Sequence, residues 1–183
     1  MAKSKFGKIL IILLALNLIL ISYLGIVARV FFRKKTMPLP TMTNKDYFTA
    51  LNKLNIEYDN NCESMDNNYY KTIIEDDIGV KMYFYLEKEM DKHAGLMFPT
   101  VRLIVMDNTL TGYEYCKTFA HEIMHIKHFI QQEDYICLET FKYLYESEEL
   151  HNVGVWYGLR VLNGFYYGKY DITEHIVDYL TKN

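Results

Sequence analysis

The sequence predicts an α+β fold in which three short strands come before a group of helices. Residues 69–74, 80–86 and 101–106 are rich in β-branched, aromatic and other apolar side chains, and polar turns separate them, which favours strands. From residue 111 onward, apolar side chains recur at helical spacing and capping residues mark helix starts. Strands followed by helices, rather than alternating with them, are typical of the α+β class.

The first half of the expected domain contains one helix and all three strands. Asn44 is a suitable N-cap for a helix over residues 45–54. The first two strands, 69–74 and 80–86, are close enough to form a β-hairpin. The third strand, 101–106, precedes the longest helical pattern of the chain and is expected at the edge of the sheet.

Capping residues delimit the helices of the second half. Thr111 and Glu114 have the spacing of a capping box and predict a helix that begins immediately after Thr111. Ser147 is expected to cap a second helix, which ends at the Asn163-Gly164 pair. A last short helix is expected within residues 171–180.

A long apolar segment lies near the amino terminus. Residues 9–28 carry no formal charge, and about 20 such residues are enough to cross a bilayer. This run is longer than the apolar core of a cleaved signal peptide, the alternative interpretation. We therefore expect a lipid-embedded anchor and divide the chain into four parts: a basic tail (1–8), a transmembrane anchor (9–32), a linker (33–42) and one folded domain (43–183).

Charge and cysteine content limit the partners and the compartment. The net charge is −3 and no basic stripe follows the anchor, so we expect no nucleic-acid partner. Basic residues flank both ends of the apolar run, so the positive-inside rule nearly cancels. The three cysteines are odd in number and lack paired metal spacing, which favours a reducing compartment. We expect a cytoplasmic domain, with an extracytoplasmic one as the alternative.

The stretch from residue 119 to 125, Phe-Ala-His-Glu-Ile-Met-His, carries the chemistry of the chain. On a helix, His121 and His125 lie on one face, where both can bind the same metal ion. Catalytic zinc takes three protein ligands and keeps a fourth position for water, whose pKa it lowers to about 7. Glu122 is placed to take a proton from that water. The pattern predicts Zn²⁺ as cofactor, His121 and His125 as ligands and Glu122 as general base.

A third ligand must come from another part of the chain. Among the acidic residues after position 145, Glu148 is our choice because Asn152 lies one turn later and could hold the second ring nitrogen of a bound histidine. Glu149 and Glu146 remain alternatives. A donor for the developing oxyanion is also expected, without a ranking among four candidates: Tyr157, Tyr167, His151 and His175.

Residues 101–108 and 116–125 together resemble the strand, turn and active-site helix of the ImmA/IrrE-like metallopeptidases, and more broadly the glutamate-zincins (gluzincins). The resemblance implies a zincin-like domain with a small antiparallel or mixed sheet, an active-site helix and a glutamate helix. It also implies that Glu148, followed by Asn152, is the third ligand. His151 stands where family members usually carry alanine.

These expectations combine into a membrane-anchored zinc endopeptidase that hydrolyses a protein or peptide substrate. An extended peptide would pair with the strand 101–106 at the sheet edge, which would present its scissile carbonyl to the metal. The alternative is a membrane-anchored binding module that keeps the fold but cleaves nothing. The presence of Glu122 beside both histidines favours the enzyme.

Overall fold

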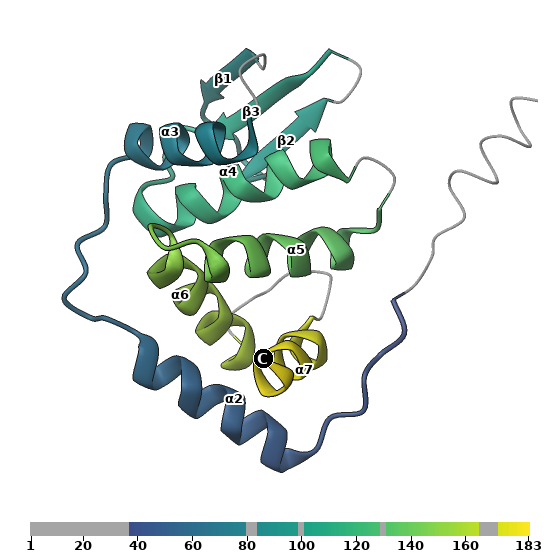
Figure 1. Cartoon of the computed structure of the whole chain (residues 1–183). Helices are drawn as coiled ribbons and strands as arrows, with labels where there is room; N and C mark the ends of the chain where they lie inside the picture. The colour runs from purple at the N-terminus through teal and green to yellow at the C-terminus, as the bar shows by residue number, and fades with distance from the viewer. Residues whose placement is uncertain (1–36, 80–83, 99–100, 129–130, 165–171) are drawn as a thin grey trace, which may run out of the picture. The chain divides into compact units, whose positions relative to one another are not determined.

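A small sheet and a stack of helices make up the computed structural model (Figure 1). It describes residues 37–79, 84–98, 101–128, 131–164 and 172–183. Within these ranges the elements are α2 (Asn44–Glu57), α3 (Asn67–Ile78), β1 (Phe84–Lys88), β2 (Gly95–Phe98), β3 (Leu103–Asp107), α4 (Gly112–Lys127), α5 (Glu133–Glu146), α6 (His151–Leu162) and α7 (Thr173–Lys182). The predicted α+β class is confirmed.

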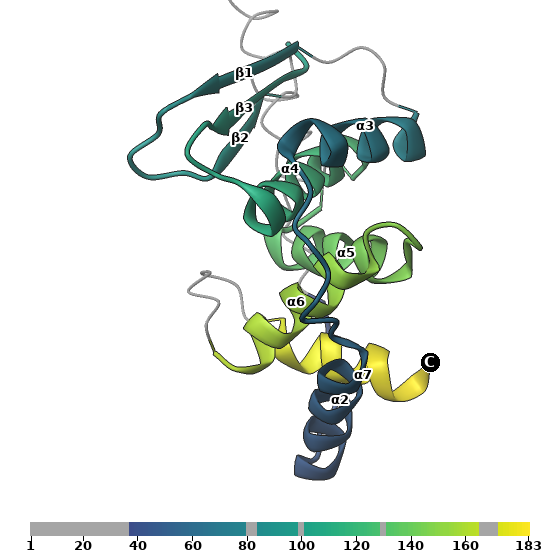
Figure 2. The ribbon, with the colours of Figure 1, turned by 90° about the vertical axis from the view of Figure 1, so that its left-hand side faces the viewer.

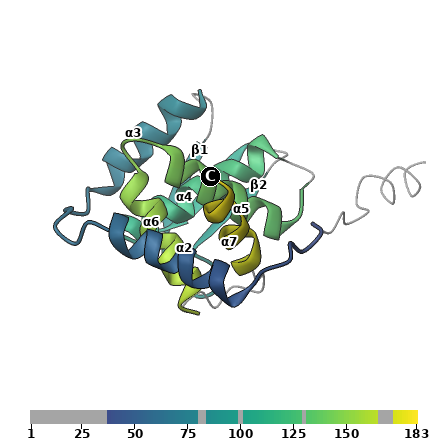
Figure 3. The ribbon, with the colours of Figure 1, turned by 60° about the horizontal axis from the view of Figure 1, so that its bottom comes forward.

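The elements form successive layers (Figure 2). The sheet lies on one side of α4, and α5 lies on the other side of this helix. Beyond α5, helix α6 packs against α2 and α7, which lie side by side (Figure 3). α4 is therefore the central helix, and several of its apolar side chains are fully buried, among them Phe119, Ala120 and Ile123.

The sheet has the strand order β1-β3-β2. β1 is parallel to β3, whereas β2 is antiparallel to it. Because β3 lies in the middle, Ile104 and Met106 are fully buried against the helices. The expectation that the strand at 101–106 is an edge strand is therefore wrong: β2, which no pattern in the sequence indicated, occupies an edge beside α4.

The predicted β-hairpin is also wrong, because residues 67–78 form helix α3. Asp66 caps it, with its carboxylate accepting a 2.8 Å hydrogen bond from the backbone N–H of Tyr69, and Gly79 ends it in the left-handed conformation at φ 71°. Tyr70, Ile73 and Ile74 are buried at helical spacing. Their aromatic and β-branched side chains fit a strand by composition, but the caps and spacing select the helix. Of the second expected strand, 84–86 belongs to β1 and 80–83 lies outside the described residues.

Loss of the Asp66 cap should destabilise the protein measurably. We expect Asp66→Ala to lower the free energy of unfolding by about 1 kcal/mol, because the N–H of Tyr69 loses its acceptor. Asp66→Asn keeps an acceptor at the same position and should stay within a few tenths of a kcal/mol of wild type. Urea unfolding followed by circular dichroism measures both, and equal loss in the two variants would contradict the capping role.

Helices α2 and α6 begin at different residues from those predicted, whereas α4 begins immediately after Thr111, as predicted. Thr43 rather than Asn44 caps α2, in a capping box with Asp46. Thr111 precedes α4 but makes no side-chain cap hydrogen bond. Ser147 ends α5 instead of opening α6, which starts at His151.

The sequence interpretation missed α5 completely and found α7 approximately. Residues 133–146 pack between α4 and α6, and Ile136, Phe141 and Leu144 are fully buried. α7 covers Thr173–Lys182, close to the expected 171–180. α5 also carries side chains that pack against α4, and none of the predicted elements contained them.

Within the described ranges, no helix combines the length and the apolar character that a bilayer crossing requires. The anchor predicted for residues 9–32 lies outside these ranges, so it stays a prediction.

Candidate metal centre

Helix α4 brings the two predicted histidines together. His121 and His125 are four residues apart, so their rings lie one turn from each other on the same face. The ring centroids are 4.8 Å apart and the planes are nearly perpendicular, at 86°. The two Nε2 atoms are only 3.2 Å apart. Both rings therefore direct the same nitrogen toward one point.

Glu133 brings a carboxylate to that point. Its Oε1 lies 2.7 Å from Nε2 of His121, and its Oε2 lies 3.3 Å from Nε2 of His125. Glu133 is the first residue of α5, and α5 packs against α4, which brings this side chain to the histidines. Two histidines and one glutamate thus converge from two packed helices.

The spacing of these three groups matches a tetrahedral zinc ion. Zinc binds histidine nitrogen and carboxylate oxygen at about 2.0–2.2 Å, so two ligand atoms of a tetrahedron lie roughly 3.3 Å apart. The contacts among His121, His125 and Glu133 are 2.7, 3.2 and 3.3 Å. The contacts of 2.7 and 3.3 Å are made by different carboxylate oxygens, Oε1 and Oε2, so both oxygens of Glu133 lie near the histidine nitrogens that would hold an ion.

Burial and hydrogen bonding shift the pKa values of these three groups, and for His121 and Glu133 the shift favours the form that binds a metal. Burial lowers the pKa of His121, which favours the neutral ring that a metal requires. Burial alone would raise the pKa of Glu133, but its hydrogen bonds with both histidines outweigh this and lower it, so the group remains a carboxylate. The pKa of His125 is raised overall: burial lowers it, but the hydrogen bond and charge of Glu133, together with the charge of Glu122, outweigh burial.

A second group of potential ligand atoms overlaps the first. His121, Glu133 and Cys137 bring ligand atoms within 4.8 Å of one another, an arrangement that could hold a metal ion. The sulfur of Cys137 lies 4.0 Å from Nδ1 of His121. That nitrogen is not the one that faces Glu133, so the thiol approaches the ring at a different edge.

Glu122 is buried beside the histidines, with 6% of its surface exposed. Burial raises the pKa of this carboxyl to about 7, and the charges of His125 and Lys117 oppose that rise. The side chain lies against β2: a Cβ added to Gly95 would come within 2.8 Å of Glu122 Cγ and 2.9 Å of Thr118 Cγ2. The edge strand and Glu122 are therefore in close contact only because residue 95 is glycine.

A methyl group at position 95 should displace Glu122. We expect Gly95→Ala to destabilise the fold by about 1–3 kcal/mol and to reduce any hydrolytic rate on the order of 10–100-fold, with bound metal unchanged. Gly158→Ala is the matched control, because its Cβ would meet Leu54 and Phe141 at 2.9 Å in the core of the other helices. The control should lose stability but keep its rate per folded molecule; equal rates in both variants would contradict the prediction.

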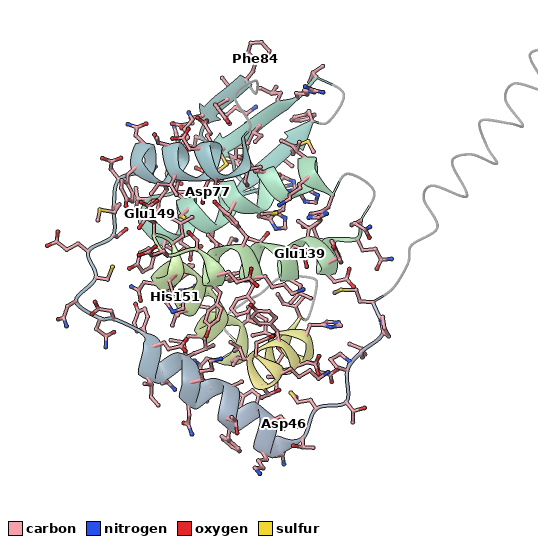
Figure 4. The ribbon with its side chains drawn as sticks, viewed as in Figure 1. Asp46, Asp77, Phe84, Glu139, Glu149 and His151 are labelled. Atoms are coloured by element: carbon pink, nitrogen blue, oxygen red, sulfur yellow. The ribbon has the colours of Figure 1, made fainter. Side chains whose placement is uncertain are left out.

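The structure does not bring Glu148, Glu149 or Glu146 to the histidines. All three are exposed at or just beyond the carboxyl end of α5, and Glu149 is labelled in Figure 4. Glu133 stands at the opposite end of this 14-residue helix, which spans about 20 Å at 1.5 Å per residue. Glu146 instead accepts a hydrogen bond from the hydroxyl of Tyr179. The sequence interpretation missed Glu133 because it did not recognise α5.

Asn152, the expected partner of a ligating histidine, serves another purpose. Its side chain exchanges hydrogen bonds with the backbone of Asp59 and donates to the hydroxyl of Tyr113. It therefore joins α6 to the segment after α2.

Of the four candidates for an oxyanion donor, three lie within the described residues and Tyr167 does not. Tyr157 is buried beside Phe141, and His151 contacts Tyr145 and Glu57. His175 belongs to α7, and Tyr167 lies outside the described residues.

Comparison with known proteins leaves the site to be judged on its geometry. No protein-family model matches this chain, and neither a curated protein nor a solved structure matches it. The convergence of His121, His125 and Glu133, with Glu122 buried next to them, is the observation on which a function can be based.

Proposed function

We propose that this protein is a zinc-dependent endopeptidase, anchored to a membrane through residues 9–32, that hydrolyses peptide bonds in a protein or peptide substrate. The observation that carries the proposal is the triangle formed by His121, His125 and Glu133, with contacts of 2.7–3.3 Å. Two imidazoles and one carboxylate are a ligand set of catalytic zinc, and the third ligand in this proposal is Glu133 rather than Glu148.

The residues present fit zinc in both chemistry and spacing. When bound, the ion polarises a carbonyl oxygen and lowers the pKa of water. The chain supplies two nitrogen ligands and one carboxylate within 2.7–3.3 Å of one another, and the three groups come from the packed helices α4 and α5. Placing a site on packed helices keeps the ligands in position without reorganisation.

Glu122 moves the proton in this proposal. It follows His121 directly and precedes His125 by three residues, so the base lies on the same stretch of α4 as the two histidine ligands. A carboxyl whose pKa is raised toward neutrality can accept a proton from the attacking water and return it to the leaving amine. Two roles, base and then acid, are thus assigned to one side chain.

The substrate in this proposal lies along β2. Among the described strands, β2 pairs only with β3, so its other edge is available for an extended peptide. Gly95 on this strand contacts Glu122 closely. A peptide that pairs with β2 would therefore run past the general base, and its main chain would be positioned by hydrogen bonds to the strand.

The alternative is a membrane-anchored binding module that keeps the zincin arrangement without catalysis. A protein that only binds does not need a buried carboxyl between its metal ligands, because burying such a group costs free energy. Glu122 is 6% exposed and sits at that position. The enzyme is therefore the function that we favour, and the resemblance to ImmA/IrrE-like metallopeptidases supports the same choice.

Metal analysis and a cleavage assay on the purified full chain test the proposal. We expect about one zinc per chain, cleavage of members of a peptide library, and loss of cleavage after chelation that added zinc reverses. Zinc without any cleavage would favour the binding module. A chain that neither retains zinc nor cleaves a peptide would contradict the proposed function.

A further inference from the structure

We propose that Cys137 is a positioning residue for the metal site: it holds His121 through Nδ1 and does not itself bind the metal. This inference rests on the proposed zinc site. The observation behind it is that His121 is contacted at both of its ring nitrogens by side chains of α5. Glu133 contacts Nε2 at 2.7 Å, and the sulfur of Cys137 lies 4.0 Å from Nδ1.

The helical spacing of α5 explains this double contact. Glu133 and Cys137 are four residues apart, so their side chains lie on the same face of α5, one turn from each other. α5 packs along α4, which carries His121. One face of α5 therefore supplies both neighbours of the ring, and a rotation of His121 would break both contacts at once.

Geometry separates the role of Cys137 from that of Glu133. The Nε2 atoms of His121 and His125 are 3.2 Å apart and both face Glu133, so an ion held there is bound through Nε2. The Cys137 sulfur is close to the other nitrogen of the His121 ring. An ion bound through Nε2 leaves Nδ1 uncoordinated, so the sulfur contacts the side of the ring that faces away from the ion.

An ion bound at Nε2 would leave the proton of His121 on Nδ1, next to the sulfur of Cys137. A histidine that binds a metal through Nε2 carries its proton on Nδ1, and an acceptor at Nδ1 stabilises this tautomer and the ring orientation. Carboxylates, carbonyl groups and water usually provide that acceptor. Here the sulfur of Cys137, which is 1% exposed, lies in that position. Sulfur is a weak acceptor, so the ring is oriented largely by packing against a buried side chain.

Zinc affinity measured by chelator competition tests the role of Cys137. We expect Cys137→Ala to weaken zinc binding by about 10–100-fold, the usual effect of removing a group that orients a ligating histidine. Cys116→Ala is the matched control. Cys116 is equally buried but lies on α4, on a different side of the helix from His121, so its loss should leave zinc affinity within about twofold of wild type.

Cobalt substitution gives a second measurement, on the wild-type chain, that does not depend on the folding of a variant. A thiolate bound to Co²⁺ produces a strong near-ultraviolet charge-transfer band, which imidazole and carboxylate ligands do not. We expect the visible bands of a tetrahedral Co²⁺ site without this thiolate band. A thiolate band in the wild type would overturn the inference and make Cys137 a ligand.

Two outcomes separate this inference from the proposed function. If Cys137→Ala and Cys116→Ala bind zinc equally well, the positioning role is overturned and the peptidase proposal stands. If the wild-type chain binds zinc but cleaves no peptide, the peptidase proposal is overturned. A loss of zinc affinity in Cys137→Ala but not in Cys116→Ala would still support the positioning role. A wild-type chain that binds neither zinc nor cobalt would overturn both.

Discussion

Glu122→Gln is expected to bind zinc as tightly as the wild type and to cleave peptides on the order of 100- to 10,000-fold more slowly, the range that a positioned general base contributes. Glutamine has nearly the same shape as glutamate but cannot accept the proton of the attacking water. Glu122 is not among the groups that converge on the metal position, so the ligand set should survive the change. The measurements are kcat with the best peptide of the library and bound zinc per chain.

Glu114→Gln is the matched control for this substitution. Glu114 lies on the same helix two turns earlier, its side chain is 45% exposed, and it pairs with Arg160 at 3.6 Å. The same chemical change there should leave both kcat and zinc content near their wild-type values, since an exposed ion pair contributes little to stability. A Glu122→Gln chain as active as Glu114→Gln would contradict the role of Glu122 as general base.

Glu133→Ala is expected to lose zinc affinity by more than about 100-fold, because removal of a group that only orients a ligand already costs 10–100-fold. The structure places both carboxylate oxygens of Glu133 within 3.3 Å of the two histidines, so alanine would leave a site with two protein ligands. Cleavage should fall with the metal. Zinc affinity from chelator competition and the zinc concentration that restores half of the activity measure the two effects.

Glu148→Ala discriminates between the two assignments of the third ligand. Glu148 is exposed in the turn after α5, so its removal should leave zinc binding unchanged. If Glu148→Ala lost zinc and Glu133→Ala kept it, the assignment from sequence would be right and the contact seen between Glu133 and the histidines would have no part in metal binding. Thermal unfolding in the presence of a chelator checks that both variants are folded.

The part of the site that is contiguous in the sequence could be predicted, and the part that comes from a second helix could not. His121, Glu122 and His125 are related by helical spacing alone, so recognition of one helix is enough to place two rings on one face. Glu133 is placed by the packing of α5 against α4. The third ligand was predicted within residues 146–149 because several acidic side chains lie close together there. These residues stand at the far end of α5 from Glu133.

In the sheet too, one strand could be predicted from its local sequence, whereas the pairing of the strands could not. The strand at 101–106 was predicted within two residues of β3, because its apolar run is typical of a buried strand. Its central position, the parallel pairing with β1 and the existence of β2 depend on contacts between distant segments. β2 is only four residues long and half-buried, so it carries no alternating pattern strong enough to identify it.

The sequence by itself determined the α+β class, the helix with its two histidines and Glu122, and the chemistry that these residue types can perform. Each of these follows from local spacing, since periodicity within one element needs no knowledge of the rest of the chain. Only the tertiary structure decided that Glu133 meets the histidines, that Cys137 contacts the second nitrogen of His121, and that Gly95 brings an edge strand onto Glu122. Those contacts join separate elements, and packing of the whole core, rather than local propensity, fixes which faces meet.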